Sequence, residues 1–228
     1  MRSIRLLIFL LFPFLTFGQV HEWGFLSGGG NYVGDIGDDT YYNPDGWRVS
    51  GFYRVNINEW YAVRVELGYG KMFAADYNAG NLGRRLRNWQ SKMEVLDGSF
   101  LFEYNFAPLN PYKRPLKLII TPYLAAGINV FRSVSHIGSN TTGAFIDNYE
   151  HSLAIPLHFG LKFSVTRRMK INWDFGLNYC LTDDFEGSRF FDSQEKPLTN
   201  RLSNDWYMTS GIGISYGFGE LPCYLNVF

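Results

Sequence analysis

The C-terminal part of the chain alternates between apolar side chains and small or polar ones. From Trp206 to Phe218 one parity carries Trp, Met, Ile, Tyr and Phe, with Ser210 as its only polar member, and the other carries Gly, Thr, Ser and Tyr207. Successive side chains of a strand point to opposite faces, so this segment has one apolar face and one small or polar face. The alternation recurs along the whole chain, which is typical of a membrane-spanning β-barrel whose apolar side chains face lipid.

Alternation and turn residues together predict eight strands. They cover residues 22–33, 47–57, 60–71, 92–106, 117–133, 151–166, 169–182 and 205–218. Each reaches the length of about 9 to 11 residues that a tilted strand needs to cross a bilayer. The sequence therefore predicts an all-β fold, a closed antiparallel eight-stranded transmembrane barrel of the outer-membrane type. Side chains fill a barrel of this size, so we expect no open path for diffusion.

Connections of two lengths alternate between these strands. Short or compact joins lie at residues 58–59, 108–115 and 167–168, whereas long polar ones cover 34–46, 72–91, 134–150 and 183–204. Bacterial barrels keep short turns in the periplasm and long loops outside the cell. The pattern therefore predicts periplasmic termini, with residues 219–228 as a periplasmic tail.

The N-terminus resembles a secretory signal peptide. Arg2 and Arg5 precede an apolar run from Leu6 to Leu15, and Thr16, Phe17 and Gly18 follow it. The run is shorter than the roughly 20 residues of a spanning helix. We expect residues 1–18 to be removed, which leaves residues 19–228 as a single barrel domain.

Composition supports the barrel and argues against nucleic-acid binding. Aromatic residues make up 18% of the chain, which also has 24 glycines, and this suits aromatic girdles around a crowded interior. The 21 basic residues balance the 21 acidic ones, so the chain has no general positive charge for a nucleic-acid partner. Cys180 and Cys223 are expected at opposite ends of the barrel and hence unpaired.

Nine charged residues fall on the inward parity of the predicted strands. They are Arg48, Arg54, Arg64, Lys162 and Lys170 with Glu66, Asp97, Glu103 and Asp174. Isolated buried charges are costly, so these groups are expected to pair in a polar network that fills the interior. A selective pore is the alternative, but pores use rings of one sign, whereas here the two signs are interleaved.

An enzymatic function has one candidate motif. Glu150, His151 and Ser152 supply the residue types of an acyl hydrolase at the predicted outer rim. Consecutive strand residues face opposite ways, so His151 and Ser152 are expected to diverge. His158 has no second His or Cys at ligand spacing. We therefore expect no catalytic residues, no metal, no cofactor and no small-molecule substrate.

Several motifs, taken in order along the chain, resemble the PorG family of small outer-membrane barrels from the type IX secretion system of Bacteroidetes. They are Glu22-Trp23-Gly24, Asn31 to Asp35, Arg64, Glu103 to Phe106, Thr121-Pro122-Tyr123 with Gly127, and Ile155-Pro156 with Gly160-Leu161-Lys162. The chain departs from the family at two positions. After Thr182-Asp183 the family continues with an aromatic residue, whereas here Asp184 intervenes before Phe185. At position 174 the family has Glu, whereas this chain has Asp174.

The resemblance implies a structural function. Members of this family are thought to tie a periplasmic ring of PorK-like and PorN-like proteins to the outer membrane, and the partners would be this ring and outer-membrane lipids. The predicted topology, not the family, supplies the candidate contact residues: Asn58, Glu59, Trp60, Tyr112, Lys113, Arg114, Arg167, Arg168, Tyr224 and Phe228. The alternatives are a generic small barrel for membrane integrity or adhesion, and a lipid acyl hydrolase.

Overall fold

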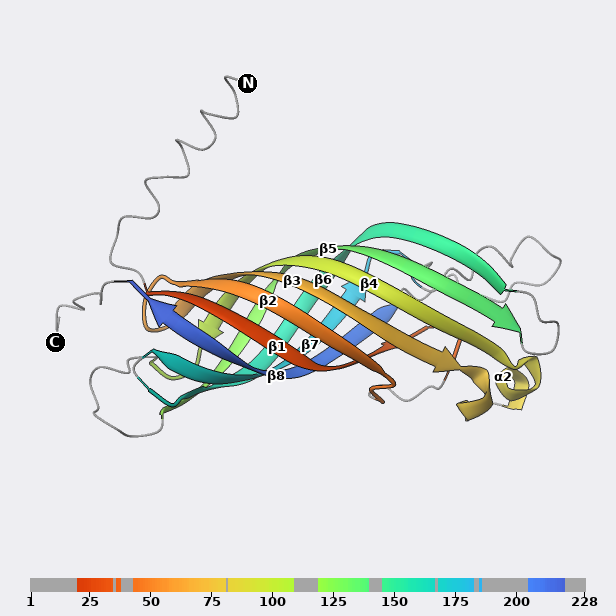
Figure 1. Ribbon diagram of the computed structural model, residues 1–228, viewed down its shortest axis with the longest axis horizontal. Coiled ribbons are helices and arrows are strands. Elements are labelled where there is room, and N and C mark those ends of the chain that lie inside the picture. Colours follow the sequence, from red (N-terminus) through yellow and green to blue (C-terminus); the bar gives the residue numbers. More distant parts are fainter. Residues whose placement is uncertain are drawn as a thin grey trace, which may run out of the picture.

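Eight antiparallel strands form one closed barrel in the computed structural model of the chain (Figure 1). The structure describes residues 20–34, 36–37, 43–80, 82–108, 119–139, 145–166, 168–182, 185 and 205–219. The strands are β1 (Val20–Val33), β2 (Gly46–Asn56), β3 (Tyr61–Ala75), β4 (Trp89–Asn105), β5 (Ile119–Ser139), β6 (Phe145–Ser164), β7 (Met169–Cys180) and β8 (Trp206–Phe218). The predicted fold class is therefore confirmed.

The barrel closes where the first strand pairs with the last. β1 pairs with β8 from His21 opposite Phe218 to Val33 opposite Trp206, and every other pair joins strands that are consecutive along the chain. The start of β1 also lies opposite the end of β2, where Val20 pairs with Asn56. The start of β1 and the end of β8 therefore lie at the end of the barrel that carries the short turns. The long connections lie at the opposite end.

The central part of each strand agrees with the sequence prediction, but the long-loop end differs. Residues 134–150 were expected to form a loop, whereas most of them belong to β5 and β6, which stay paired up to Gly138 opposite Phe145. Hydrophobic alternation fades here because polar side chains occupy both faces, while the backbone hydrogen bonds continue. Periodicity reports the environment of the side chains, so it missed the extension.

The predicted loop 72–91 is also partly ordered as secondary structure. β3 and β4 extend into it, and a 3-10 turn, η2 (Asp76–Asn78), and a short helix, α2 (Leu82–Arg87), connect them. Figure 1 shows β3 to β6 reaching farther than the other strands toward the end where α2 lies. The barrel wall is therefore asymmetric, with one side projecting past the other.

The two faces of the wall are inverted relative to a soluble protein. Large apolar side chains such as Leu67, Phe100 and Ile128 are exposed on the outside, whereas Arg64 and Lys162 are fully buried inside. No helix in the described part of the chain is long and apolar enough to cross a membrane. The outward apolar band and the polar interior are the features that a barrel in lipid requires.

Candidate functional site

The barrel interior holds a charge-balanced network of ten buried side chains. Nine are the residues expected from inward parity, Arg48, Arg54, Arg64, Glu66, Asp97, Glu103, Lys162, Lys170 and Asp174, and the tenth is Glu22. Glu22 lies on the inward parity of β1, and this parity could have identified it. It was missed because it is the first residue of the predicted strand, where the direction of a side chain is hard to assign. With it, five acidic groups face five basic ones inside the barrel.

Glu22 organises the network near the short turns. Its carboxylate accepts hydrogen bonds from Arg54 Nη1 at 3.0 Å and Asn56 Nδ2 at 2.7 Å, and it forms an ion pair with Lys170. Arg54 Nε lies 2.9 Å from Glu103 Oε2. Both carboxylates and both cations are buried, so each charge has a partner at a place that excludes bulk water.

Glu103 on β4 connects this group to Lys162, which lies two strands away on β6. Lys162 Nζ donates to Glu103 Oε2 at 2.6 Å and to Asn105 Oδ1 at 2.8 Å, and it lies 4.6 Å from the ring centre of Tyr123. Two ligating oxygens and one aromatic face therefore surround the ammonium group. This environment replaces much of the hydration that burial removes.

Arg64 crosses the middle of the interior. Its guanidinium lies 3.0 Å from Glu103 Oε1 and 3.0 Å from Asp174 Oδ2. Asp174 also accepts a hydrogen bond from the hydroxyl of Tyr123 and lies 2.8 Å from His158 Nδ1. His158 is thus a buried partner of Asp174.

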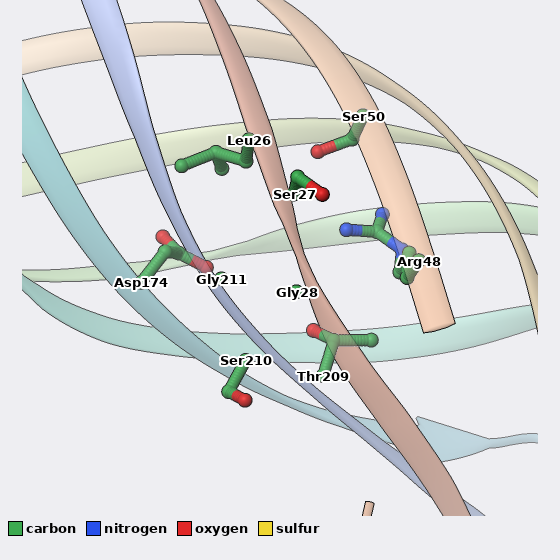
Figure 2. A pocket seen from close by; sticks show the side chains of 9 residues that line it. All are labelled: Leu26, Ser27, Gly28, Arg48, Ser50, Asp174, Thr209, Ser210 and Gly211. Atoms are coloured by element: carbon green, nitrogen blue, oxygen red, sulfur yellow. The ribbon is translucent and has the colours of Figure 1, made fainter. Parts of the chain in front are cut away.

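Arg48 forms the last part of the network toward the long-loop end. It lies 3.0 Å from Glu66 and 2.8 Å from Asp97. Figure 2 shows Arg48 and Asp174 on two sides of a cavity of about 10 Å³, which Ser50 and Thr209 also line. This volume holds roughly one water molecule. The cavity therefore has room for a bridging water.

An aromatic cluster covers the network at the long-loop end. Phe185, from the connection after β7, is fully buried and stacks on Tyr207 with ring centres 5.2 Å apart and an interplanar angle of 5°. Phe131 packs against both rings. The backbone of Phe185 is held by Asp205 Oδ2 at 3.1 Å and by Ser133 Oγ at 3.3 Å. Sequence periodicity gave no signal for this residue because it follows the strand.

The hydrolase motif is not assembled. His151 is exposed on the outside of β6, whereas the next residue, Ser152, lies on the inward parity. Within the described ranges, no group of three or more His, Cys, Asp or Glu side chains is arranged to hold a metal ion. Cys180 is buried and carries a free thiol, and Cys223 lies outside the described residues.

The short-turn end presents Trp60 on a rigid turn. Asn58 Oδ1 accepts hydrogen bonds from the backbone amides of Trp60 at 2.8 Å and Tyr61 at 2.7 Å, and Asn105 Nδ2 donates to the carbonyl of Glu59 at 3.3 Å. Trp60 is 41% exposed at this end. These bonds order the backbone of a turn that carries a large, exposed amphipathic side chain.

Seven other residues were predicted to contact a periplasmic partner, and the structure describes one of them, Arg168. Arg168 closes the turn before β7, and its guanidinium donates to the hydroxyl of Tyr216 at 3.3 Å. Tyr112, Lys113, Arg114, Arg167, Tyr224 and Phe228 lie outside the described residues, as does the expected signal peptide. The candidate surface is therefore described at the turn around Trp60 and at Arg168.

Comparisons with known proteins agree on the fold. A family model described as "Domain of unknown function (DUF6089)" matches residues 1–227, and no curated relative matches the sequence. The structure of Ail, the attachment invasion locus protein of Yersinia pestis, is 10% identical over 88% of this chain and 99% of its own, with a TM-score of 0.50.

Two further solved structures are more distant in shape. Neisserial surface protein A is 14% identical over 87% of this chain and 97% of its own, with a TM-score of 0.48. The outer membrane protein OprG from Pseudomonas aeruginosa is 11% identical over 89% of this chain and 97% of its own, with a TM-score of 0.47. At such identities the likeness concerns the fold alone.

Proposed function

The chain belongs to the family described as a domain of unknown function (DUF6089), and from this membership and the closed barrel we propose that it is a non-enzymatic outer-membrane protein that anchors a periplasmic assembly. The outward apolar band supports the membrane location, because its side chains would be costly to expose to water. Periplasmic termini follow from the short turns at that end of the barrel.

The filled interior is the observation that carries the anchoring function. Ten paired charges and an aromatic cluster occupy the space that a transport pathway would need. The hydrolase motif has its histidine and serine on opposite faces. What remains available for function is the outward surface and the two ends, which are surfaces for binding partners.

We assign the partner as a ring of PorK-like and PorN-like proteins of the type IX secretion system. The resemblance in the motifs from Glu22 to Lys162 supports this assignment. The turn around Trp60 supports it independently, because tryptophan is enriched at interfaces and its side chain, with two rotatable bonds, loses little entropy on binding. Asn58, Glu59 and Arg168 provide polar groups around this end.

The test is recovery of the ring proteins from native membranes. Trp60→Ala should leave an inserted barrel but reduce recovery of ring proteins at least tenfold, because a buried aromatic anchor at an interface is worth about 2 kcal/mol or more. Trp206→Ala is the matched control, since Trp206 is 40% exposed but lies on β8 at the long-loop end. Wild-type recovery with Trp60→Ala, together with normal secretion, would contradict docking at this turn.

A generic barrel for membrane integrity or adhesion is the second candidate. The projecting ends of β3 to β6 favour it, because they present an ordered surface at the long-loop end. The same purification separates the two functions. If the wild-type protein recovers no periplasmic ring proteins while its deletion weakens the envelope or surface attachment, the generic function is supported and anchoring is wrong.

A further inference from the structure

Two cationic side chains, Lys92 and Arg132, and one histidine, His151, lie on the outside of the projecting wall near Tyr149. Arg132 on β5 pairs in register with His151 on β6, and Lys92 on β4 pairs with His136 on β5. Lys92, Arg132 and His151 are all exposed. We call Lys92, Arg132, His151 and Tyr149 the outer cationic patch.

The patch begins where the outward apolar band ends. On β5, Ile128 and Val130 are exposed apolar residues, and the next outward side chain is Arg132. On β6, Leu153 is exposed and apolar, and the next outward side chain toward the long-loop end is His151. The two neighbouring strands thus change from apolar to cationic at the same level, which is where lipid head groups meet a barrel.

Two acidic residues on the same face already have side-chain partners. Glu94 lies 2.5 Å from Lys71 Nζ and also accepts a hydrogen bond from Tyr69, and Asp147 lies 2.5 Å from His136 Nδ1. The guanidinium of Arg132 lies 5.8 Å from the ring centre of Tyr149. Within the described ranges, no acidic side chain pairs with Lys92, Arg132 or His151. The patch therefore has an excess of positive charge.

We propose that the outer cationic patch binds the phosphate groups of a diphosphorylated glycolipid in the outer leaflet. The inference rests on the proposed membrane orientation, which places the long-loop end outside. Arg132 suits one phosphate, because a guanidinium binds phosphate oxygens in a bidentate way and His151 stands directly opposite across the strand pair. Tyr149 adds an amphipathic ring at head-group level.

Lys92 is placed to bind the second phosphate. It lies opposite His136, four positions along β5 from Arg132, which corresponds to roughly 13 Å. At that separation one phosphate meets both cations only if both long side chains lean toward it, whereas two phosphates on one sugar head group can each meet one of them directly. The spacing therefore favours a glycolipid with two phosphates over a phospholipid with one.

Binding of diphosphorylated lipid A to the full chain in detergent micelles tests the inference. The double variant Lys92→Gln with Arg132→Gln should bind about 30-fold more weakly, since each cation near an anionic lipid surface contributes about 1 kcal/mol. Arg85→Gln is the control, because it removes an exposed cation from outside the patch. Its affinity should equal that of the wild type.

The lipid is varied in the same assay. Dephosphorylated lipid A should bind the wild type and the patch variant equally weakly, and phosphatidylglycerol should bind more weakly than lipid A. Equal affinity of the patch variant and the wild type for lipid A would overturn the inference, as would equal affinity of the wild type for phosphatidylglycerol and lipid A. The binding assay in micelles uses no ring proteins and does not depend on how the barrel is oriented in a membrane. Its result is therefore independent of the recovery of ring proteins from native membranes.

Discussion

At the scale of single residues, the interior depends on the pairing of buried charges. Glu103 lies between three cations, with Arg54 at 2.9 Å, Arg64 at 3.0 Å and Lys162 at 2.6 Å. Charges at this depth cannot be hydrated by bulk water, so their stability depends on the opposite charges beside them. The loss of one carboxylate would leave three cations facing one another.

Glu103→Ala should therefore lower the free energy of unfolding by about 3 to 5 kcal/mol, because it leaves buried positive charge uncompensated. Glu94→Ala is the control, since it breaks an ion pair with Lys71 in which both side chains are more than a third exposed. Solvent screens that pair, so the control should change stability little. Urea unfolding in lipid vesicles measures both, and equal losses would mean that Glu103 is solvated.

At the scale of elements, closure of the barrel depends on close contact between β1 and β8. A Cβ atom added to Gly213 would lie 1.8 Å from the carbonyl oxygen of Phe25, and one added to Gly28 would lie 1.9 Å from that of Ser210. Both obstacles are backbone atoms, which cannot move without shifting a strand. Glycine is thus needed on both sides of the seam.

Gly213→Ala should destabilise the barrel by about 1 to 3 kcal/mol, because the added methyl group forces the strands apart. The control is Gly51→Ala on β2, where no atom lies within 4 Å of the added Cβ. This substitution should be neutral or slightly stabilising, since alanine loses less backbone entropy than glycine on folding. Thermal unfolding followed by the heat-dependent mobility shift in gels compares the two, and similar midpoints would contradict the close approach.

At the scale of the whole molecule, packed side chains fill the barrel interior between its two ends. The charged network occupies the part nearer the short turns, and the aromatic cluster around Phe185, Phe131 and Tyr207 closes the other end. A cavity of about 10 Å³, which has room for roughly one water molecule, lies beside Arg48. The molecule is therefore built to present its outward surface and ends.

The reconstituted protein should accordingly show no steady ion conductance in planar bilayers. An open porin inserted under the same conditions is the control for the measurement. Reproducible conductance steps from the wild-type barrel would show that the network and the aromatic cluster do not block the interior, and they would reopen the selective pore as a function.

The sequence by itself determined the number of strands, their central residues and the inward position of nine charged residues. Alternation carries this information because every second side chain meets the same environment along a strand. Arg64 and Lys162 were thus assigned to the interior from parity alone. Glu22 obeys the same rule, but its position at a strand end hid it.

Only the tertiary structure decided which charges meet, how far the wall projects and what closes the barrel. Lys170 pairs with Glu22 across 148 positions and Arg64 with Asp174 across 110, and closure of the sheet creates both contacts. The extensions of β5 and β6 depend on backbone hydrogen bonds that polar side chains do not reveal. Phe185 lies outside the strands, so the alternation of side chains along a strand could not predict its position. Its ring packs on Tyr207 inside the closed barrel, and this contact exists only in the folded protein.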